Sequence, residues 1–503
     1  MKQIFPILLI TFLFGILFTS CRDDFEFEPS QGTELAFSKD TVYLDTIFSN
    51  IGSSTYQLKV YNRSKNDIQI PKIHLKKGEN SKFRLSVDGF TGKSFENIEL
   101  LAEDSLFVFI ETTVDISEQT QEKDFLYTDE LVFQSLQSTN EVQLVTLVKD
   151  AHFLYPQRYS DQTYESIAFN DEQVYGFFLD ENDEVNGNEL QWNNEKPYVI
   201  YGYAAVPPGK TLTISEGTDI HFHAQSGLLV FPTAELLANG TIDNPIIVQG
   251  NRLEPYYEDI PGQWGMIFIG QNSKADLKNM LIKNATYGLY INTNSQPVTL
   301  ENIQVYNCTD YGIVGQAASI NAKNVVTNNI GRAALALTYG GNYEFNHCTF
   351  ANYWNRAGHT AVLIDNSENY PLQATFKNSI IHSASPESLI IATGNEQSAS
   401  QLYFDYCLIK FFDTSNQLSG NYPYEFSNAS VYNQCLIAKY AQQYPPYFKN
   451  ITKNQLMPTD QATSIIGYGS IQNAQQVPND IQGFSRVSSP DLGAYQHVIN
   501  TDE

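Results

Sequence analysis

Five residues in the second half of the chain have types and spacings that could bind a charged ligand together. They are Arg332, Tyr353, Trp354, Arg356 and His359. Arginine is scarce in this region, and Arg332 and Arg356 follow two equivalent positions of a sequence repeat by eight and nine residues. Stacking of the repeats would therefore bring both arginines to one turn. Aromatic faces beside guanidinium groups suit a sugar ring that carries a carboxylate or a sulfate.

A structural role is the alternative for the same five residues. In that case Trp354 packs beneath the turn, while each arginine binds backbone carbonyls or the carboxylate of Asp310. Structural networks produce clusters of this kind as well. The sequence leaves both interpretations open.

No set of catalytic residues is recognisable beside these five. Hydrolysis of glycosidic bonds uses paired carboxylates, yet the chain has no adjacent pair of aspartates apart from Asp23-Asp24. The outward positions expected on one strand of each repeat carry no general base; they are Tyr290, Val314, Ala336, Leu363 and Ile390. We therefore predict no catalytic residue.

Two stretches resemble metal sites, and neither supplies enough ligands. His221 and His223 alternate with apolar residues, so both should point outward from one strand, but no third ligand accompanies them. The acidic stretch 180–189 fails as a calcium-binding loop, because Asn182 and Asn193 stand where carboxylates are needed. We predict no metal site and no cofactor.

The strands and turns that position these residues are predicted by a repeated phrase of eight residues. It occurs seven times between residues 277 and 439. It reads L-K-N-M-L-I-K-N from Leu277 and F-K-N-S-I-I-H-S from Phe376. Its third positions, separated by 23, 22, 23, 31, 28 and 28 residues, are Asn279, Asn302, Asn324, His347, Asn378, Tyr406 and Gln434. Such spacing indicates a stacked repeat, because one unit cannot bury its apolar face alone.

Each phrase predicts two short strands that meet at the third position. Asn is usual there, and it tolerates the left-handed backbone that a one-residue corner needs. The fourth and sixth positions show the period-two pattern of strands with one buried face. The fourth positions are Met280, Ile303, Val325, Cys348, Ser379, Cys407 and Cys435, and the sixth are Ile282, Val305, Thr327, Phe350, Ile381, Ile409 and Ile437. A third strand precedes most phrases, so each repeat predicts one coil of a parallel β-helix.

Residues 31–150 predict a domain of a different kind. Strand-like runs alternate with turn clusters over 55–62, 68–75, 82–87, 95–101, 106–115, 130–134 and 141–149. Seven short strands in this length indicate a β-sandwich. The phrases L-K-V-Y-N-R-S-K-N-D-I-Q-I from Leu58, F-R-L-S-V-D-G from Phe83 and D-S-L-F-V-F-I-E-T-T-V-D from Asp104 resemble immunoglobulin-like domains of the Hydin type. That resemblance implies a spacer or docking module.

The predicted β-helix also resembles known protein families. L-T-I-S-E-G-T-D-I-H-F-H from Leu212 and P-G-Q-W-G-M-I-F-I from Pro261 resemble the opening coils of right-handed β-helices of the pectate-lyase type. N-D-I-Q-G-F-S-R-V-S-S-P-D-L-G-A-Y from Asn479 resembles the terminal segment of bacterial surface β-helix proteins classed by variable anchors of the Q-like kind, although Gln496 replaces the acidic residue often seen next. The resemblance implies a fold and no activity, because this fold hosts enzymes, adhesins and inert scaffolds.

The predicted fold class is all-β, with an N-terminal immunoglobulin-like β-sandwich followed by a right-handed single-stranded parallel β-helix. We expect a lipoprotein signal peptide over residues 1–20, an acidic tether over 21–30 and the sandwich over 31–150. A linker and β-helix cap should occupy 151–197, and the β-helix with its C-terminal cap should occupy 198–498.

The N-terminus resembles that of a bacterial lipoprotein. An apolar run over residues 4–18 is too short to span a bilayer comfortably, and Thr19-Ser20-Cys21 follows it. The small residues before Cys21 resemble a lipobox, which implies cleavage before Cys21 and lipidation of that residue; ordinary secretion is the alternative. The acidic residues 23–28 resemble the export signal of some Gram-negative surface lipoproteins, or form a solvated tether. We therefore expect a lipid-anchored, surface-exposed protein of the outer membrane.

The net charge of the chain restricts the classes of molecule that it can bind. The net charge of −26 argues against nucleic acid and against binding of anionic lipid through basic patches. Attachment to the membrane would then depend on the lipid anchor.

Cys407 and Cys435 should face each other on adjacent coils about 4.8 Å apart. A disulfide between them is therefore geometrically possible, but we favour free thiols that fill the core.

These observations predict a lipid-anchored cell-surface protein that acts as a non-catalytic scaffold or binding module, for a glycan or another envelope component. The alternative is a polysaccharide lyase or glycoside hydrolase of the β-helix fold with an unrecognised site.

Overall fold

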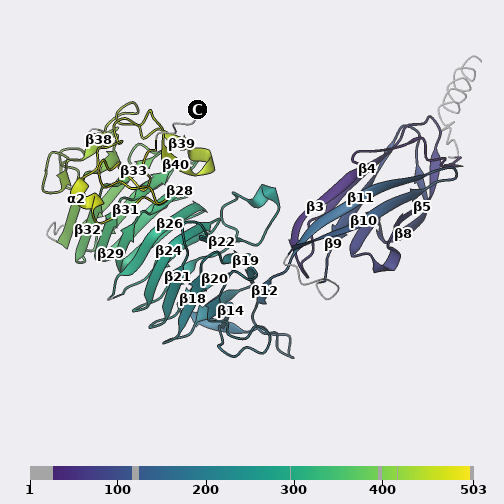
Figure 1. Ribbon diagram of the computed structural model, residues 1–503, viewed down its shortest axis with the longest axis horizontal. Helices are drawn as coiled ribbons and strands as arrows, with labels where there is room; N and C mark the ends of the chain where they lie inside the picture. The colour runs from purple at the N-terminus through teal and green to yellow at the C-terminus, as the bar shows by residue number, and fades with distance from the viewer. Residues whose placement is uncertain (1–25, 116–123, 295, 395–398, 416, 499–503) are drawn as a thin grey trace, which may run out of the picture. The chain divides into compact units, whose positions relative to one another are not determined.

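The computed structural model (Figure 1) describes residues 26–115, 124–294, 296–394, 399–415 and 417–498. The chain is all-β, as predicted, and it divides into two units between Asp150 and Ala151. Within the described ranges, no helix has the length and apolar character needed to cross a membrane. The expected signal peptide and Cys21 lie outside the described residues.

The first unit consists of two sheets whose buried side chains share one core. The six-stranded sheet contains β1 (Glu28–Pro29), β5 (Ile68–Leu75), β10 (Asp124–Gln134), β11 (Thr139–Lys149) and β3 (Thr41–Phe48) in that order, with β8 (Ser94–Leu100) also paired to β5. The five-stranded sheet contains β2 (Leu35–Phe37), β4 (Tyr56–Asn62), β9 (Ser105–Thr112), β6 (Phe83–Val87) and β7 (Phe90–Gly92). A single turn of 3-10 helix, η1 (Gly78–Asn80), precedes β6.

All seven strands predicted for this unit are present. The sequence did not predict β3, which pairs with β11. A register shift between Val145 and Leu147 interrupts that pairing, and the buried positions of β3 do not alternate regularly. A β-bulge of this kind breaks the period-two signal on which strand prediction depends.

The second unit is a parallel β-helix in which each strand pairs with the equivalent strand of the next coil. One sheet contains β14 (Glu172–Phe178), β17 (Tyr203–Val206), β20 (Gly227–Val230), β23 (Ile267–Ile269), β25 (Tyr287–Ile291), β27 (Tyr311–Lys323), β29 (Ala333–Asn346), β31 (Thr360–Asn366) and β34 (Leu389–Thr393). The second contains β15 (Gln191–Trp192), β18 (Thr211–Ser215), β21 (Glu235–Asn239), β24 (Lys274–Lys283), β26 (Val298–Cys308), the second halves of β27 and β29, β32 (Leu372–Lys377), β35 (Ser400–Asp405) and β37 (Tyr432–Asn433). The third contains β12 (His152–Leu154), β16 (Tyr198–Ile200), β19 (Asp219–Phe222), β22 (Ile246–Gly250), the second halves of β24 and β26, β28 (Val326–Ile330), β30 (Thr349–Asn352), β33 (Ile380–Ser383), β36 (Leu408–Lys410) and β38 (Leu436–Ala438).

The first coil begins earlier than the sequence indicated. Residues 151–197, expected as linker and cap, already contribute β12, β14 and β15, which pair in parallel with β16, β17 and β18. The strand β13 (Ser166–Phe169) forms an antiparallel hairpin with β14. No repeat phrase marks this coil, because its corners are built from different residues.

The predicted corner residues adopt the left-handed conformation at every repeat. Their φ angles are 47° at Asn279, 57° at Asn302, 52° at Asn324, 53° at His347, 45° at Asn378, 53° at Tyr406 and 50° at Gln434. The amide of Asn302 donates to the side-chain oxygen of Asn279 at 2.9 Å, and the amide of Asn324 donates to that of Asn302 at 2.9 Å. The corners are therefore joined by a ladder of side-chain hydrogen bonds that fixes the register of adjacent coils.

The predicted inward columns form the core of the β-helix. The sixth-position residues pair in register from Val305 through Phe350 to Ile437, and Phe350 is fully buried. Aromatic rings at the first position stack coil upon coil, with centroid distances of 4.9, 5.0 and 5.1 Å along Phe345, Phe376, Phe404 and Tyr432. Among the described residues all four cysteines are free thiols, including the facing pair Cys407 and Cys435.

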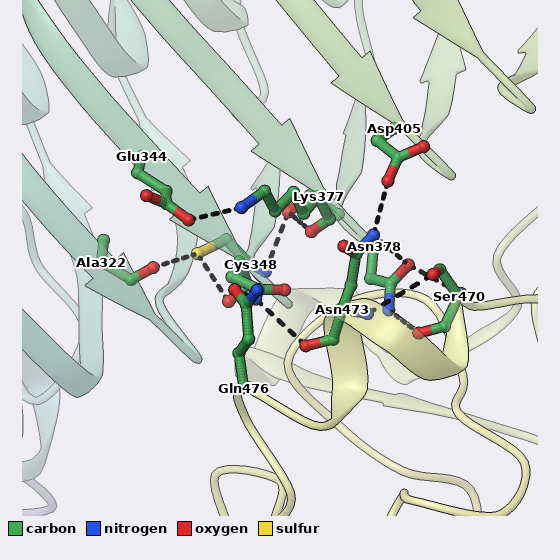
Figure 2. Close-up of polar contacts among 11 residues, drawn as sticks. Ala322, Glu344, Cys348, Lys377, Asn378, Asp405, Ser470, Asn473 and Gln476 are labelled. Carbon is green, nitrogen blue, oxygen red and sulfur yellow. Dashed lines mark hydrogen bonds and ion pairs between the residues drawn. The ribbon is translucent and has the colours of Figure 1, made fainter.

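The C-terminal segment folds back along the corner ladder. It contains the hairpin of β39 (Phe448–Asn450) and β40 (Gln455–Pro458), the 3-10 turn η5 (Ile451–Lys453) and the short helix α2 (Ile471–Ala474). Figure 2 shows the contact between α2 and the coils: Ser470 and Asn378 exchange two hydrogen bonds of 2.9 Å, and the amide of Asn473 donates to Asp405 at 2.7 Å.

Arg486 anchors the same segment further along. Its guanidinium is buried and donates to Asn324 at 3.1 Å and to the carbonyls of Gly493 and Ala494 at 3.0 and 3.1 Å. Burial lowers the pKa of Arg486 to about 10, although Asp480 and Asp491 favour the charged form. Removal of this arginine would leave the ladder oxygen of Asn324 without its donor from the C-terminal segment.

The assignment of Phe350 to an inward position and of Asn302 to a corner predicts how much each contributes to stability. Phe350→Ala should lower the free energy of unfolding by about 3–5 kcal/mol, because it leaves a cavity in the core beside the aromatic stack, against which Phe350 packs edge-on. Asn302→Ala should cost less, since it removes ladder hydrogen bonds and little packing. Chemical denaturation followed by circular dichroism measures both. A Phe350→Ala protein as stable as wild type would show that this column does not face the core.

Candidate functional site

A pocket of about 1000 Å³ lies beside the sheet of β29, β31 and β34. We call it the arginine pocket. Ala333, Leu363 and Ile390 form its apolar floor. Its walls are the turn 354–359, the turn 384–387, and the side chains of Tyr311 and Arg332. The structure thus brings four of the five predicted binding residues together; they are Arg332, Trp354, Arg356 and His359.

The turn 354–359 is held by the buried side chain of Asn352 at the end of β30. Its oxygen accepts from the backbone of Ile330 at 2.9 Å, and its amide donates to the carbonyls of Ile330 and Thr360 at 2.8 and 2.9 Å. The start of β31 is therefore joined to the end of β30 across the turn. His359 closes the turn from inside, because its Nδ1 lies 2.7 Å from the carbonyl of Arg356.

Arg332 is fixed at the edge of the pocket by two neighbours on the previous coil. Its Nε lies 3.1 Å from a carboxylate oxygen of Asp310, and its guanidinium lies 5.9 Å from the ring centroid of Tyr311. The Arg332 side chain remains 65% exposed. The contact with Asp310 is the one expected of a structural role, yet the exposed part of the guanidinium is available to a ligand.

Arg356 and Glu387 face the same pocket from different turns. Neither side chain makes a hydrogen bond or an ion pair with any residue that the structure describes, and Arg356 is exposed. His359 differs because it is 7% exposed, and its Nε2 has no hydrogen-bond partner within the described part of the chain. The pocket therefore contains a free cation and a carboxylate, while the unpaired imidazole nitrogen of His359 is buried in the turn that forms its wall.

Tyr353 does not belong to this pocket, which corrects the expected set. Its hydroxyl lies 2.8 Å from Nδ1 of His382, and its ring packs edge-on against Phe448 at 6.2 Å. Adjacent residues of an extended chain point to opposite sides, so Trp354 borders the pocket while Tyr353 packs against the C-terminal segment. Burial raises the pKa of Tyr353 and lowers that of His382 to about 3, with Lys410 contributing to the second shift.

The sequence did not identify Tyr311 and Glu387 as pocket residues. Tyr311 stacks on Tyr287 of the previous coil, with ring centroids 5.7 Å apart and planes inclined by 21°. An alignment of the repeats places Tyr287 and Tyr311 at equivalent positions, with Arg332 beside the equivalent position of the next coil. This alignment could have identified Tyr311. Glu387 lies in a turn without a repeat phrase, so no spacing pointed to it.

The outward row predicted to lack a general base runs in register from Tyr290 through Val314, Ala336 and Leu363 to Ile390. Tyrosine is its single titratable residue type, and burial raises the pKa of Tyr290. Leu363 and Ile390 of this row belong to the apolar floor of the arginine pocket.

The two histidines of the predicted outward pair have different surroundings. Nδ1 of His221 lies 3.0 Å from the carbonyl of Gly250, Nε2 lies 2.9 Å from Asp219, and the side chain is buried. His223 is exposed and stacks on Tyr201 at 4.5 Å. Across the described ranges, no three His, Cys, Asp or Glu side chains are grouped so that they could hold a metal ion.

Residues 175–350 match the family model described as "Right handed beta helix region". These residues have the fold of a right-handed β-helix. The match confirms the predicted fold class together with the sandwich. No curated protein sequence matches the chain.

Several solved structures are similar to parts of the chain at low identity. The ASH/PapD-like domain of human CEP192 is 12% identical over 24% of this chain and 89% of its own, with a TM-score of 0.16. The periplasmic chaperone SfaE is 13% identical over 23% of this chain and 57% of its own, with a TM-score of 0.16. The catalytic unit of an α-1,3-glucanase from Streptomyces thermodiastaticus is 9% identical over 70% of this chain and 62% of its own, with a TM-score of 0.17. This chain therefore spans less than two thirds of the chaperone and of the glucanase unit, and these likenesses transfer no function.

The half-buried imidazole of His382 makes stability depend on pH. Because its pKa falls from 6.5 to about 3 on folding, the unfolded chain takes up a proton near pH 6.5 and the folded chain does not. The contribution of His382 to the free energy of unfolding is therefore complete above pH 6.5. It decreases as the pH falls, by up to about 1.4 kcal/mol per pH unit. His382→Gln should flatten the decline of unfolding free energy between pH 7 and 5. Equal slopes for the two proteins would show that His382 is protonated in the folded state.

Proposed function

We propose that this protein is a lipid-anchored cell-surface protein that binds an anionic saccharide in the arginine pocket without cleaving it. The observation that carries the proposal is the convergence of Arg332, Trp354 and Arg356 on one concave surface with an apolar floor. Pockets of this size with a few converging polar groups are the usual form of ligand sites.

The charge of the pocket favours an acidic ligand. The chain as a whole carries a net charge of −26, yet two guanidinium groups gather at this pocket. Arg356 has no counter-ion among the described residues, and the planar fork of arginine pairs with carboxylate and sulfate groups through two parallel hydrogen bonds. An anionic group of a sugar would supply the missing partner.

The aromatic side chains favour a ring-shaped ligand. Trp354 and Tyr311 both line the pocket, and the stacked ring of Tyr287 extends the aromatic surface onto the previous coil. Large flat side chains contribute contact area at a low cost in conformational entropy. Glu387, in the turn 384–387, offers a hydrogen-bond acceptor for sugar hydroxyls.

A polysaccharide lyase or glycoside hydrolase is the second candidate function. One observation favours it: Glu387 and His359 line the same pocket, and a carboxylate and an imidazole are groups that can exchange protons with a substrate. We place this second because the adjoining outward row carries no basic or acidic side chain.

The proposed location at the cell surface rests on the N-terminal sequence alone. Cys21 and the residues before it lie outside the described residues. The proposal is supported by the short apolar run, the small residues before Cys21 and the acidic stretch behind it. A site that binds extracellular glycan would then be presented outside the cell.

Binding tests the leading proposal. Trp354→Ala combined with Arg356→Ala should weaken binding of polygalacturonate or chondroitin sulfate at least tenfold, because an aromatic face and a free guanidinium are lost together. Isothermal titration calorimetry measures the affinity, and thermal unfolding checks that the fold is intact. Arg252→Ala, at an exposed arginine paired with Glu254 outside the pocket, is the matched control. The proposal fails if wild type binds no acidic glycan, or if the double variant binds equally well.

The anchor has a separate test. Cys21→Ser should prevent lipidation and release the protein from the membrane fraction, because the thiol that accepts the lipid is gone. Incorporation of labelled palmitate and fractionation of cells measure the two effects. A wild-type chain that incorporates no palmitate, with a variant that stays membrane-bound, would contradict lipid anchoring at Cys21.

A further inference from the structure

A second concave surface lies on the outer face of β27, β29, β32 and β35. It is a groove of about 720 Å³, and its polar lining residues include Asn294, Ser319, Asn342, Gln373 and Gln401. We call it the amide groove. No charged side chain is among its described lining residues, although the chain contains 56 acidic and 30 basic residues.

Four of these residues form a row at right angles to the strands. Ser319 pairs with Asn342, Asn342 with Gln373, and Gln373 with Gln401, each on the next coil. Adjacent strands are about 4.8 Å apart, so the row presents polar groups at a regular spacing. The side chains of Asn342, Gln373 and Gln401 are exposed and make no hydrogen bond with the described residues. Each free carboxamide offers two donors and an acceptor.

The floor of the groove is rigidly supported from below. The buried hydroxyl of Tyr343 lies 3.1 Å from the backbone nitrogen of Ala318 and 2.8 and 3.0 Å from the carbonyls of Gly340 and Gly315. These bonds hold a bulge in β27, where the register shifts between Gln316 and Ala318. Bulges re-aim side chains and are common beside binding sites.

A glycine and an asparagine complete this support. Gly341 has a φ of 117°, and a Cβ there would approach the carbonyl of Ala318 to 2.4 Å, so the close approach of the two coils requires glycine. The buried side chain of Asn294 accepts from the backbone of Ser319 at 2.7 Å and fixes the wall of the groove. The amide row is therefore carried on a framework that does not need to rearrange when a ligand binds.

Two exposed tyrosines stand next to the groove in the chain. Tyr339 is 51% exposed and precedes Gly340, while Tyr370 is 44% exposed and lies between two groove residues. Their ring centroids are 5.8 Å apart, and both line a smaller hollow of about 220 Å³. Exposed aromatic rings beside a polar groove give a ligand apolar faces to stack on.

We propose that the amide groove binds a neutral saccharide, at a site separate from the arginine pocket. Sugar hydroxyls both donate and accept hydrogen bonds, and carboxamides are the uncharged side chains that do the same. The absence of a cation among the described lining residues argues against a carboxylate, sulfate or phosphate ligand. The regular row along the coils suits an extended chain of sugar units. This inference goes beyond the proposed function, because it concerns another face and another class of ligand.

The experiment uses the chain without residues 1–21, which keeps every described residue. Maltohexaose, cellohexaose, laminarihexaose and mannohexaose are titrated by calorimetry and by saturation-transfer NMR. At least one should bind, and Gln373→Ala combined with Gln401→Ala should weaken that binding at least tenfold. Asn321→Ala, on β27 but outside the groove lining, should leave it unchanged, as should the Trp354→Ala and Arg356→Ala pair.

A charge-introducing variant keeps the test decisive if the double alanine variant does not fold. Gln373→Glu preserves the size of the side chain at an exposed position, and it should weaken binding by removing the amide donors. The inference is overturned if none of the four oligosaccharides binds at millimolar concentration, or if the groove variants bind as well as wild type. Loss of binding in the arginine-pocket variant alone would instead place the neutral ligand in that pocket.

Discussion

The one-residue corner is the constraint on which the rest of the β-helix depends. At each repeat the chain turns at a single residue with a φ between 45° and 57°, a conformation that Asn accepts more readily than other residues with a Cβ. Ladder hydrogen bonds of 2.9 Å join Asn279, Asn302 and Asn324, so the register of one coil determines that of the next. Every other position then lies at a fixed offset from a corner. Arg332 and Arg356 reach the same pocket for this reason, eight and nine residues beyond corners that stack.

The C-terminal segment completes the ladder where asparagine no longer continues it. At His347, Nε2 lies 2.9 Å from the amide nitrogen of Asn378, and Nδ1 lies 3.2 Å from the carbonyl of Gly493. Burial, reinforced by Arg486, lowers the pKa of His347 well below its usual value, so the imidazole is neutral and can accept the hydrogen bond from Asn378. The returning segment also covers Tyr353 through Phe448. One side of the turn that carries Trp354 is thereby packed, which leaves the other side to form the pocket wall.

The sequence predicted the features of the β-helix that follow from its hydrophobic periodicity. Corners, inward columns and the outward row through Leu363 were predictable, because each recurs at a fixed place in the repeat. Tyr353 was misplaced because its partners, His382 and Phe448, come from outside its own coil. The amide groove was missed although Asn342, Gln373 and Gln401 each stand five residues before a corner, because polar residues at outward positions look like ordinary solvated side chains. Bulges such as those in β3 and β27 shift the register locally, and the periodicity of the sequence does not reveal them.

The central claim is that the arginine pocket binds an acidic saccharide and leaves it intact. The most direct measurement is to incubate the protein with an acidic polysaccharide that it binds and to follow the length of that polysaccharide by size-exclusion chromatography, with ultraviolet detection of unsaturated sugar ends. The account predicts a bound polysaccharide of unchanged length and no unsaturated product after prolonged incubation. Progressive shortening that is abolished by Glu387→Gln or His359→Gln would contradict it and would establish the protein as an enzyme.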